Sequence, residues 1–120
     1  MINLDSDRWE SLKAFDSSKA VVEVIRKLDF IHEDDDEVDS LLAELDNQLC
    51  HQLSIMPIAY AAIPHIIRIA ERRHDKVGTA LTVITGTIIA FSRDIDLDQI
   101  DCDIKEWYLN SIENFKQLTY

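Results

Sequence analysis

Apolar residues recur every three or four positions along most of this chain, the spacing that places them on one face of a helix. Ser6 stands just before one such segment, and Ser17 and Ser18 stand before the next, where a serine side chain can accept a hydrogen bond from the helix start. We therefore expect a short helix at about 6–15 and a second one after Ser17 that contains residues 21–30. A third is expected at about 36–52, because the acidic residues before it suit a helix N-terminus.

A fourth helix is expected from Pro57 to about Arg73, since proline is well tolerated in the first turn. Apolar residues cover most of its circumference, which predicts a buried position at the centre of the fold. Pro64 lies inside it and should leave the Tyr60 carbonyl without its helical donor and bend the helix. We predict that the following residues are buried: Tyr60, Ile63, Ile66, Ile67 and Ile84.

Residues 77–91 allow two interpretations, because they are rich in the β-branched residues threonine, valine and isoleucine. Two short strands with a turn at Gly86 are one alternative. We favour a single buried helix, because two isolated strands make a marginal sheet and the neighbouring segments are helical in pattern.

The segment 94–103 alternates acidic and apolar residues and is expected to be a link with Ile95, Leu97 and Ile100 turned inward. A last helix should run from Ile104 to the end. The whole chain, 1–120, is thus expected to be one all-α domain whose six helices stack as antiparallel hairpins. Its content of two glycines and two prolines argues against an all-β fold, which needs many turns.

Charge is distributed unevenly around a formal net charge of −11. Residues 1–49 contain 14 acidic and 5 basic residues, 50–93 contain 2 and 5, and 94–120 contain 7 and 2. Such a surface repels phosphate backbones, so direct nucleic-acid binding is not expected, whereas a basic protein would be attracted. The candidate partner-binding residues are Asp34, Asp35, Asp36, Glu37, Asp94, Asp96, Asp98, Asp101 and Asp103. Alternatively these acids only solvate links and helix starts, and binding involves Trp107 and Tyr108.

The sequence contains no complete motif for a metal site, a phosphate-binding loop or a catalytic site. Asp94, Asp96 and Asp98 begin like a calcium loop, but Gln99 stands where the turn needs glycine and Lys105 where a bidentate glutamate is required. The histidines lack the spacing of zinc ligands, there is no glycine-rich phosphate loop, and Cys50 and Cys102 are expected to be thiols. We therefore expect no enzyme activity, no cofactor and no metal.

The basic group at the end of the fourth helix complements the helix dipole or contacts an anion or an acidic partner. It comprises Arg68, Arg72, Arg73, His74 and Lys76. The most apolar stretch is broken by prolines and charges, so no transmembrane helix is expected. The acidic N-terminus is unlike a secretory signal, so a cytoplasmic location is expected.

Two short motifs resemble a segment of small bacterial HEAT-like helical-repeat proteins: Leu49-Cys50-His51-Gln52 and Tyr60-Ala61-Ala62-Ile63-Pro64-His65-Ile66-Ile67. The likeness extends over about 45–70. Some proteins of this kind are immunity proteins of polymorphic or contact-dependent toxin systems, which are small, cytoplasmic and often acidic. The resemblance thus implies a protein that binds and neutralises a cognate toxin domain, and charge favours a basic one such as a nuclease. The alternative is a helical-repeat adaptor or scaffold protein.

Overall fold

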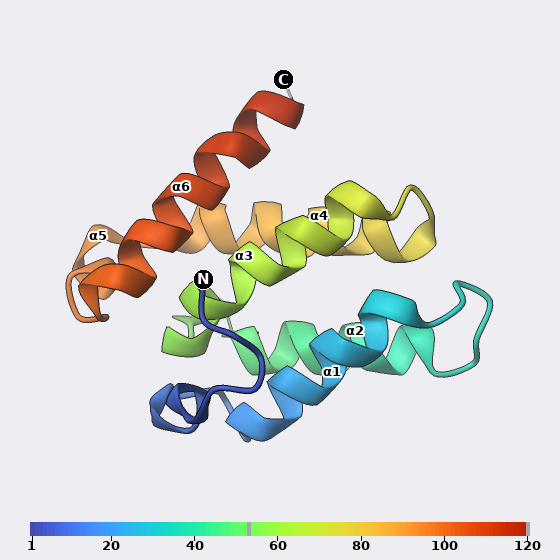
Figure 1. The fold of residues 1–120 in the computed structure, drawn as a ribbon, viewed down its shortest axis with the longest axis horizontal. Coiled ribbons are helices and arrows are strands. Elements are labelled where there is room, and N and C mark those ends of the chain that lie inside the picture. Colours follow the sequence, from blue (N-terminus) through green and yellow to red (C-terminus); the bar gives the residue numbers. More distant parts are fainter. Residues whose placement is uncertain (53, 120) are drawn as a thin grey trace.

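The structure, a computed structural model, describes residues 1–52 and 54–119. Side chains are described for residues 1–52 and 54–116. The fold is all-α, as predicted, with one very small sheet (Figure 1). The helices are the 3-10 helix η1 (Asp7–Ser11), α1 (Ser18–Phe30), α2 (Val38–Leu49), α3 (Pro57–Arg72), α4 (Lys76–Phe91), α5 (Asp94–Leu97) and α6 (Cys102–Thr119). The strands are β1 (Cys50–His51) and β2 (Ser54–Ile55).

Predicted capping serines stand at the N-termini of the first two helices. The side chain of Ser6 accepts a hydrogen bond from the Arg8 backbone and that of Ser17 from the Ala20 backbone. The first helix is nevertheless much shorter than predicted. The Gln48 side chain accepts hydrogen bonds from the backbones of Asp16 and Ser17, and the Gln48 carbonyl accepts one from Phe15. This segment is therefore bonded to α2 instead of continuing a helix.

The segment rich in β-branched residues forms one helix, α4, and the two-strand alternative is wrong. Its threonines fit a helix because each hydroxyl donates a hydrogen bond to the carbonyl four residues earlier. The pairs are Thr79 with Asp75, Thr82 with Gly78, Thr85 with Leu81 and Thr87 with Val83. The predicted burial of this helix is correct for one side only, because the Val83 side of α4 faces solvent.

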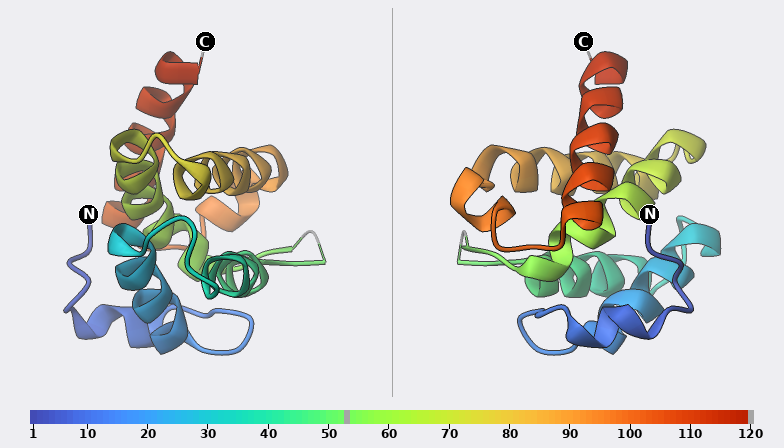
Figure 2. Two further views of the ribbon diagram at one scale, coloured as in Figure 1. Left: turned by 90° about the vertical axis from the view of Figure 1, so that its right-hand side faces the viewer. Right: turned by 60° about the vertical axis from the view of Figure 1, so that its left-hand side comes forward.

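The helices form two layers, with α1, α3 and α6 in one and α2 and α4 in the other (Figure 2). The hairpins are α1 with α2 and α3 with α4, while α6 packs against α3. The predicted pairing into three hairpins therefore shifts by one element, because η1 and α5 are too short to act as hairpin arms. Between α3 and α6 the rings of Tyr60 and Tyr108 meet edge to face, with centroids 4.9 Å apart.

The central position of α3 is confirmed. Its predicted core residues Tyr60, Ile63, Ile66 and Ile67 are buried, as is Ile84 of α4. The helix continues through Pro64, and its bend there stays a prediction.

The third predicted helix was extended too far. It ends at Leu49, and the next residues form the antiparallel pairs of β1 and β2, in which Cys50 lies opposite Ile55 and His51 opposite Ser54. Gln52 adopts a positive φ of 52° in the turn. The Met56 backbone donates a hydrogen bond to the Leu49 carbonyl at 2.8 Å and so closes the hairpin ahead of α3.

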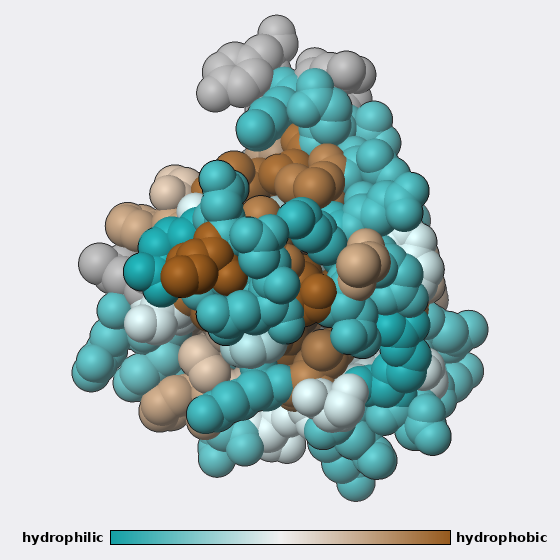
Figure 3. Space-filling model, turned by 90° about the vertical axis from the view of Figure 1, so that its left-hand side faces the viewer, coloured by the Kyte–Doolittle hydropathy of each residue, from teal (hydrophilic) through white to brown (hydrophobic). Residues whose placement is uncertain are grey.

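The acidic link contains the short helix α5 and only part of the predicted inward packing. Leu97 is buried and Ile100 is half-buried, but Ile95 is 60% exposed, so its predicted orientation is wrong. Figure 3 looks onto the end of the molecule that carries α5, where apolar side chains interrupt the polar surface. This end is therefore not a uniformly solvated acidic face.

Candidate functional site

The most uneven charge in the molecule lies on α2 and the loop before it. From residue 28 to 67 the chain has nine acidic residues and no lysine or arginine. Seven of the nine acids are exposed, and we call them together the acidic surface: Asp34, Asp35, Asp36, Glu37, Asp39, Glu44 and Asp46. Negative charge is concentrated here without cations from the same stretch to offset it.

The first predicted run of acids belongs to this surface. It forms the loop between α1 and α2 and makes mainly local contacts: the Asp34 backbone donates to His32 Nδ1 at 3.1 Å, and the Glu37 backbone donates to Asp35 Oδ1 at 2.9 Å. The carboxylates of Asp36 and Glu37 make no ion pair with the part of the chain that the structure describes. Both are thus available to an incoming cation.

The second predicted run is mostly neutralised within the chain. Asp96 pairs with Arg93 at 3.2 Å, Asp98 with Lys105 at 2.9 Å, and Asp101 and Asp103 both with Arg8, at 3.2 and 2.7 Å. Only Asp94 has no cationic partner among residues 1–52 and 54–116.

Arg8 gives that second run a structural role. Its guanidinium bonds both oxygens of Asp103 and lowers the pKa of that carboxyl below its ordinary value. The contact ties η1 to the start of α6, which are far apart in the sequence. We infer that Asp101 and Asp103 hold η1 against the start of α6, which the sequence pattern alone did not indicate.

The two runs do not form one surface. The loop that carries Asp34 and the helix α5 lie at opposite ends of the long axis, which measures 39 Å (Figure 1). Exposed charges farther apart than about 8 Å are largely screened at physiological salt. The predicted site residues therefore divide into an unpaired group beside α2 and a paired group around α5.

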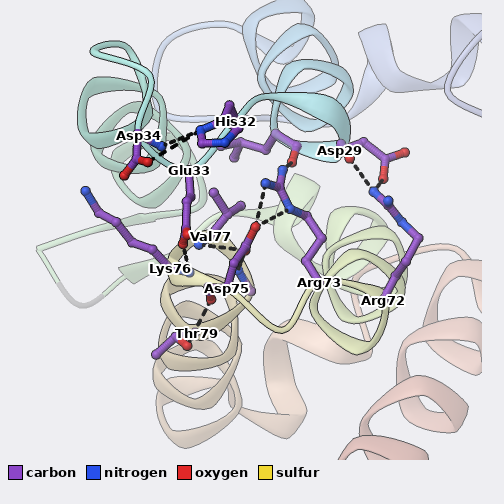
Figure 4. A network of polar contacts seen from close by, with 12 residues as sticks. Asp29, His32, Glu33, Asp34, Arg72, Arg73, Asp75, Lys76, Val77 and Thr79 are labelled. Carbon is purple, nitrogen blue, oxygen red and sulfur yellow. Dashed lines mark hydrogen bonds and ion pairs between the residues drawn. The ribbon is translucent and has the colours of Figure 1, made fainter.

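The basic group at the end of α3 is used inside the molecule (Figure 4). Arg68 and Arg72 both pair with Asp29 of α1, with Arg68 at 3.2 Å. The Arg73 guanidinium donates to the Leu28 carbonyl at 2.7 Å and pairs with Asp75 at 2.8 Å. Arg72 lies in the last turn of α3, where a cation complements the helix dipole as predicted. The ion pairs of this group are with aspartates of the chain itself, and contact with an external anion or acidic partner stays a prediction.

Asp75 connects this network to α4. Its carboxylate caps the helix by accepting hydrogen bonds from the backbones of Val77 and Gly78, and Arg73 lowers its pKa from the ordinary value. Lys76 then reaches across to α2, where its ammonium lies 3.0 Å from Asp39. With these contacts every arginine of the chain pairs with an aspartate, while Asp36 and Glu37 of the acidic surface have no ion-pair partner among the described residues.

The alternative binding surface around Trp107 and Tyr108 is only partly accessible to solvent. Tyr108 is buried, its hydroxyl donates to Ser92 Oγ at 3.3 Å, and burial raises its pKa. Trp107 is half-buried and lines a pocket of about 320 Å³ together with Pro64 and Ile67. Burial likewise raises the pKa of Tyr60, to about 12. Tyr60 and Tyr108 form the contact between α3 and α6, so of the two aromatic residues in the alternative only Trp107 is accessible to a partner, and binding there stays a prediction.

His65 is the one deeply buried histidine among the described residues. Its Nε2 lies 2.6 Å from the Ile2 carbonyl, so this nitrogen carries the proton and donates it. Its Nδ1 is buried without a partner in the described structure, and burial lowers the pKa of the ring. His65 therefore holds the N-terminal segment against α3.

Among the side chains that the structure describes, no three histidine, cysteine, aspartate or glutamate residues gather as metal ligands. Asp94 and Asp96 lie on the helix α5 and not in a calcium loop. Cys50 and His51 are neighbours on a strand, so our expectation of a helix there was wrong. The His51 ring stacks on Phe15 with centroids 3.7 Å apart. Both cysteines are thiols.

Two features of the sequence carried more information than we took from them. The absence of lysine and arginine from 28 to 67 already separates the first acidic run from the second, whose aspartates have basic neighbours. The absence of charge from 77 to 92 indicated burial, although one side of that helix is exposed.

The described part of the chain contains no helix with the length and apolar character needed to cross a membrane. Comparison with family models, curated proteins and solved structures finds no match for this chain.

Proposed function

We propose that this chain is an immunity protein that binds a basic toxin domain through the acidic surface and neutralises it. The observation that supports the proposal most strongly is the distribution of paired and unpaired charge. The arginines are bound to aspartates of the same chain, while Asp36, Glu37 and their neighbours remain exposed. Asp101 and Asp103, in contrast, are paired with Arg8 of the same chain.

The charge also suggests the kind of toxin. Domains that act on nucleic acids hold phosphates with lysine and arginine. An acidic protein can cover such cations and keep the substrate away, and its field speeds the encounter. A nuclease domain is therefore the target that the acidic surface suits best.

The test uses the domain encoded at the C-terminus of the adjacent upstream reading frame, purified alone. We expect the chain to bind it and to abolish its activity at one equivalent. An unrelated protein of similar size and net charge is the control and should leave the activity unchanged. Binding that leaves the domain fully active would favour the adaptor alternative, and no binding would remove the proposal.

A further inference from the structure

The outward side of α4 is unusual for a surface helix. Residues 77–92 contain no charged side chain. One side of the helix packs into the core, while the opposite side is exposed and presents Thr79, Val83, Gly86, Ala90 and Phe91. Val83 is 64% exposed and Phe91 44%. A helix without a polar face is normally buried on all sides, so this side has the character of a contact surface.

The two glycines of α4 differ in whether packing within this chain requires a glycine. A Cβ at Gly78 would collide with the Arg73 carbonyl oxygen, so internal packing requires glycine there. A Cβ at Gly86 would meet nothing within 4 Å. Glycine weakens a helix relative to alanine, and nothing inside the described chain accounts for it at position 86. The backbone at Gly86 is open to close approach from outside.

The distribution of charge around α4 indicates which kind of partner binds its outward side. The acidic surface of α2 lies beside α4 in the same layer, and the ion pair between Lys76 and Asp39 joins the two helices (Figure 2). An interface with an apolar centre and a charged rim is a common arrangement. A second copy of this chain would bring the same acids and another net charge of −11 against this rim. A partner with lysine and arginine around an apolar patch would instead be complementary to both parts.

A pocket marks one end of this surface. The hairpin of β1 and β2 projects on the side of the α2 and α4 layer (Figure 2). Between it and α4 lies a pocket of about 270 Å³ lined by Ser54, Ile55, Phe91, Arg93 and Asp96. Ile55 and Phe91 form one apolar wall, while Ser54 and the paired Arg93 and Asp96 make the rest of the lining polar, so an apolar side chain of a partner would fit only against that one wall. Buried anchors of this kind contribute much of the binding energy of protein interfaces.

We infer that the outward side of α4, with the acidic surface as its rim, is the docking surface for a protein that presents an apolar patch bordered by lysine and arginine. This inference rests on the proposed function and adds the surface and the chemistry of the contact. The apolar centre should hold the complex together, so its loss should speed dissociation. The acidic rim should mainly govern association.

The experiment compares two variants in binding to the same upstream-encoded domain. Val83→Glu places a carboxylate at the centre of the α4 surface, and Leu109→Glu, at a residue 40% exposed on α6 in the other layer, is the matched control. We expect Val83→Glu to weaken binding by at least about tenfold through faster dissociation, and Leu109→Glu to change it by less than about twofold. Circular dichroism and denaturant melts verify that both variants fold.

Each other outcome overturns the inference in a distinguishable way. If Val83→Glu binds as tightly as the wild-type chain, the inference is wrong and the proposed function stands. If the chain alone sediments as a dimer that Val83→Glu dissociates, a second copy covers α4. If the wild-type chain binds no basic domain, the proposed function fails and the inference fails with it.

Discussion

The ammonium of Lys76 lies 3.0 Å from a carboxylate oxygen of Asp39 and joins the first turn of α4 to the first turn of α2. The backbone of Lys76 also donates a hydrogen bond to the Glu33 carboxylate at 2.9 Å. These contacts bring the loop before α2 and the start of α4 together. An exposed ion pair contributes at most about 1 kcal/mol, so its main effect here is to place an acidic helix beside an uncharged one.

Replacement of Ile66 by alanine tests the central position of α3. The side chain is fully buried, so its truncation leaves a cavity and should lower the free energy of unfolding by about 2–5 kcal/mol. Denaturant melts measure the change. Val83→Ala is the control, because the exposed side chain should contribute less than about 0.5 kcal/mol. Equal losses for the two variants would contradict the assignment of α3 as the core helix.

The two glycines of α4 should respond in opposite directions to alanine. Gly78→Ala places a methyl group against the backbone of Arg73 and should destabilise the chain by about 1–3 kcal/mol. Gly86→Ala adds a methyl group in open space and should stabilise it by about 0.5–1 kcal/mol. Melts of the two variants beside the wild type measure both effects. A loss of stability in Gly86→Ala would show that internal packing requires this glycine.

The buried His65 should make stability depend on pH. Its pKa is lowered, chiefly by burial and also by Arg68 and the Met1 amino group, while the Ile2 carbonyl and Asp29 act against this. Below about pH 6.5 the unfolded chain then binds a proton that the folded chain does not, so stability falls as the pH decreases.

The variant His65→Gln checks this pH dependence, because glutamine keeps an N–H donor for Ile2 but does not titrate. Its urea midpoint should vary less than that of the wild type between about pH 7 and about pH 5. The carboxyls of Asp75 and Asp103, whose pKa values are also lowered, lose their contribution only below about pH 4 and do not interfere. Parallel curves for the two proteins would contradict the assignment.

Two triple variants with equal charge change separate the two acidic runs. Replacement of Asp34, Asp35 and Asp36 by asparagine removes three unpaired or locally bonded carboxylates from the acidic surface. At about 0.15 M salt we expect this triple to lower the association rate with a basic partner several-fold, because screening leaves only nearby charges effective. Stopped-flow binding measures the rate.

The matched triple replaces Asp94, Asp98 and Asp101, of which the last two are paired with Lys105 and Arg8, and leaves Asp96 of the pocket beside α4 unchanged. It should leave the association rate nearly unchanged at this salt concentration. Equal slowing by both triples would show that the partner responds to the net charge of the chain instead of the acidic surface.

The all-α fold could be predicted because its signals are local. The apolar spacing, the capping serines and Pro57 define α1 to α3, and the threonines of α4 satisfy their hydroxyls within the helix. The hairpin after Leu49 could not be predicted, since the Met56 backbone hydrogen bond that closes it depends on the folded geometry. Among the candidate site residues, the acids of both runs look alike in the sequence. Only the contact of Arg8 with Asp103, from the other end of the chain, shows that the second run is neutralised.

The salt dependence of association tests the central claim most directly, namely that the acidic surface recognises a basic toxin domain. Stopped-flow rates with the upstream-encoded domain would be measured from about 0.01 M salt, where the Debye length is about 30 Å, to about 0.15 M, where it is about 8 Å. We predict that the association rate constant falls at least about tenfold across this range while the dissociation rate constant changes little. An association rate constant that does not change with salt, or no binding at any salt, would contradict the claim.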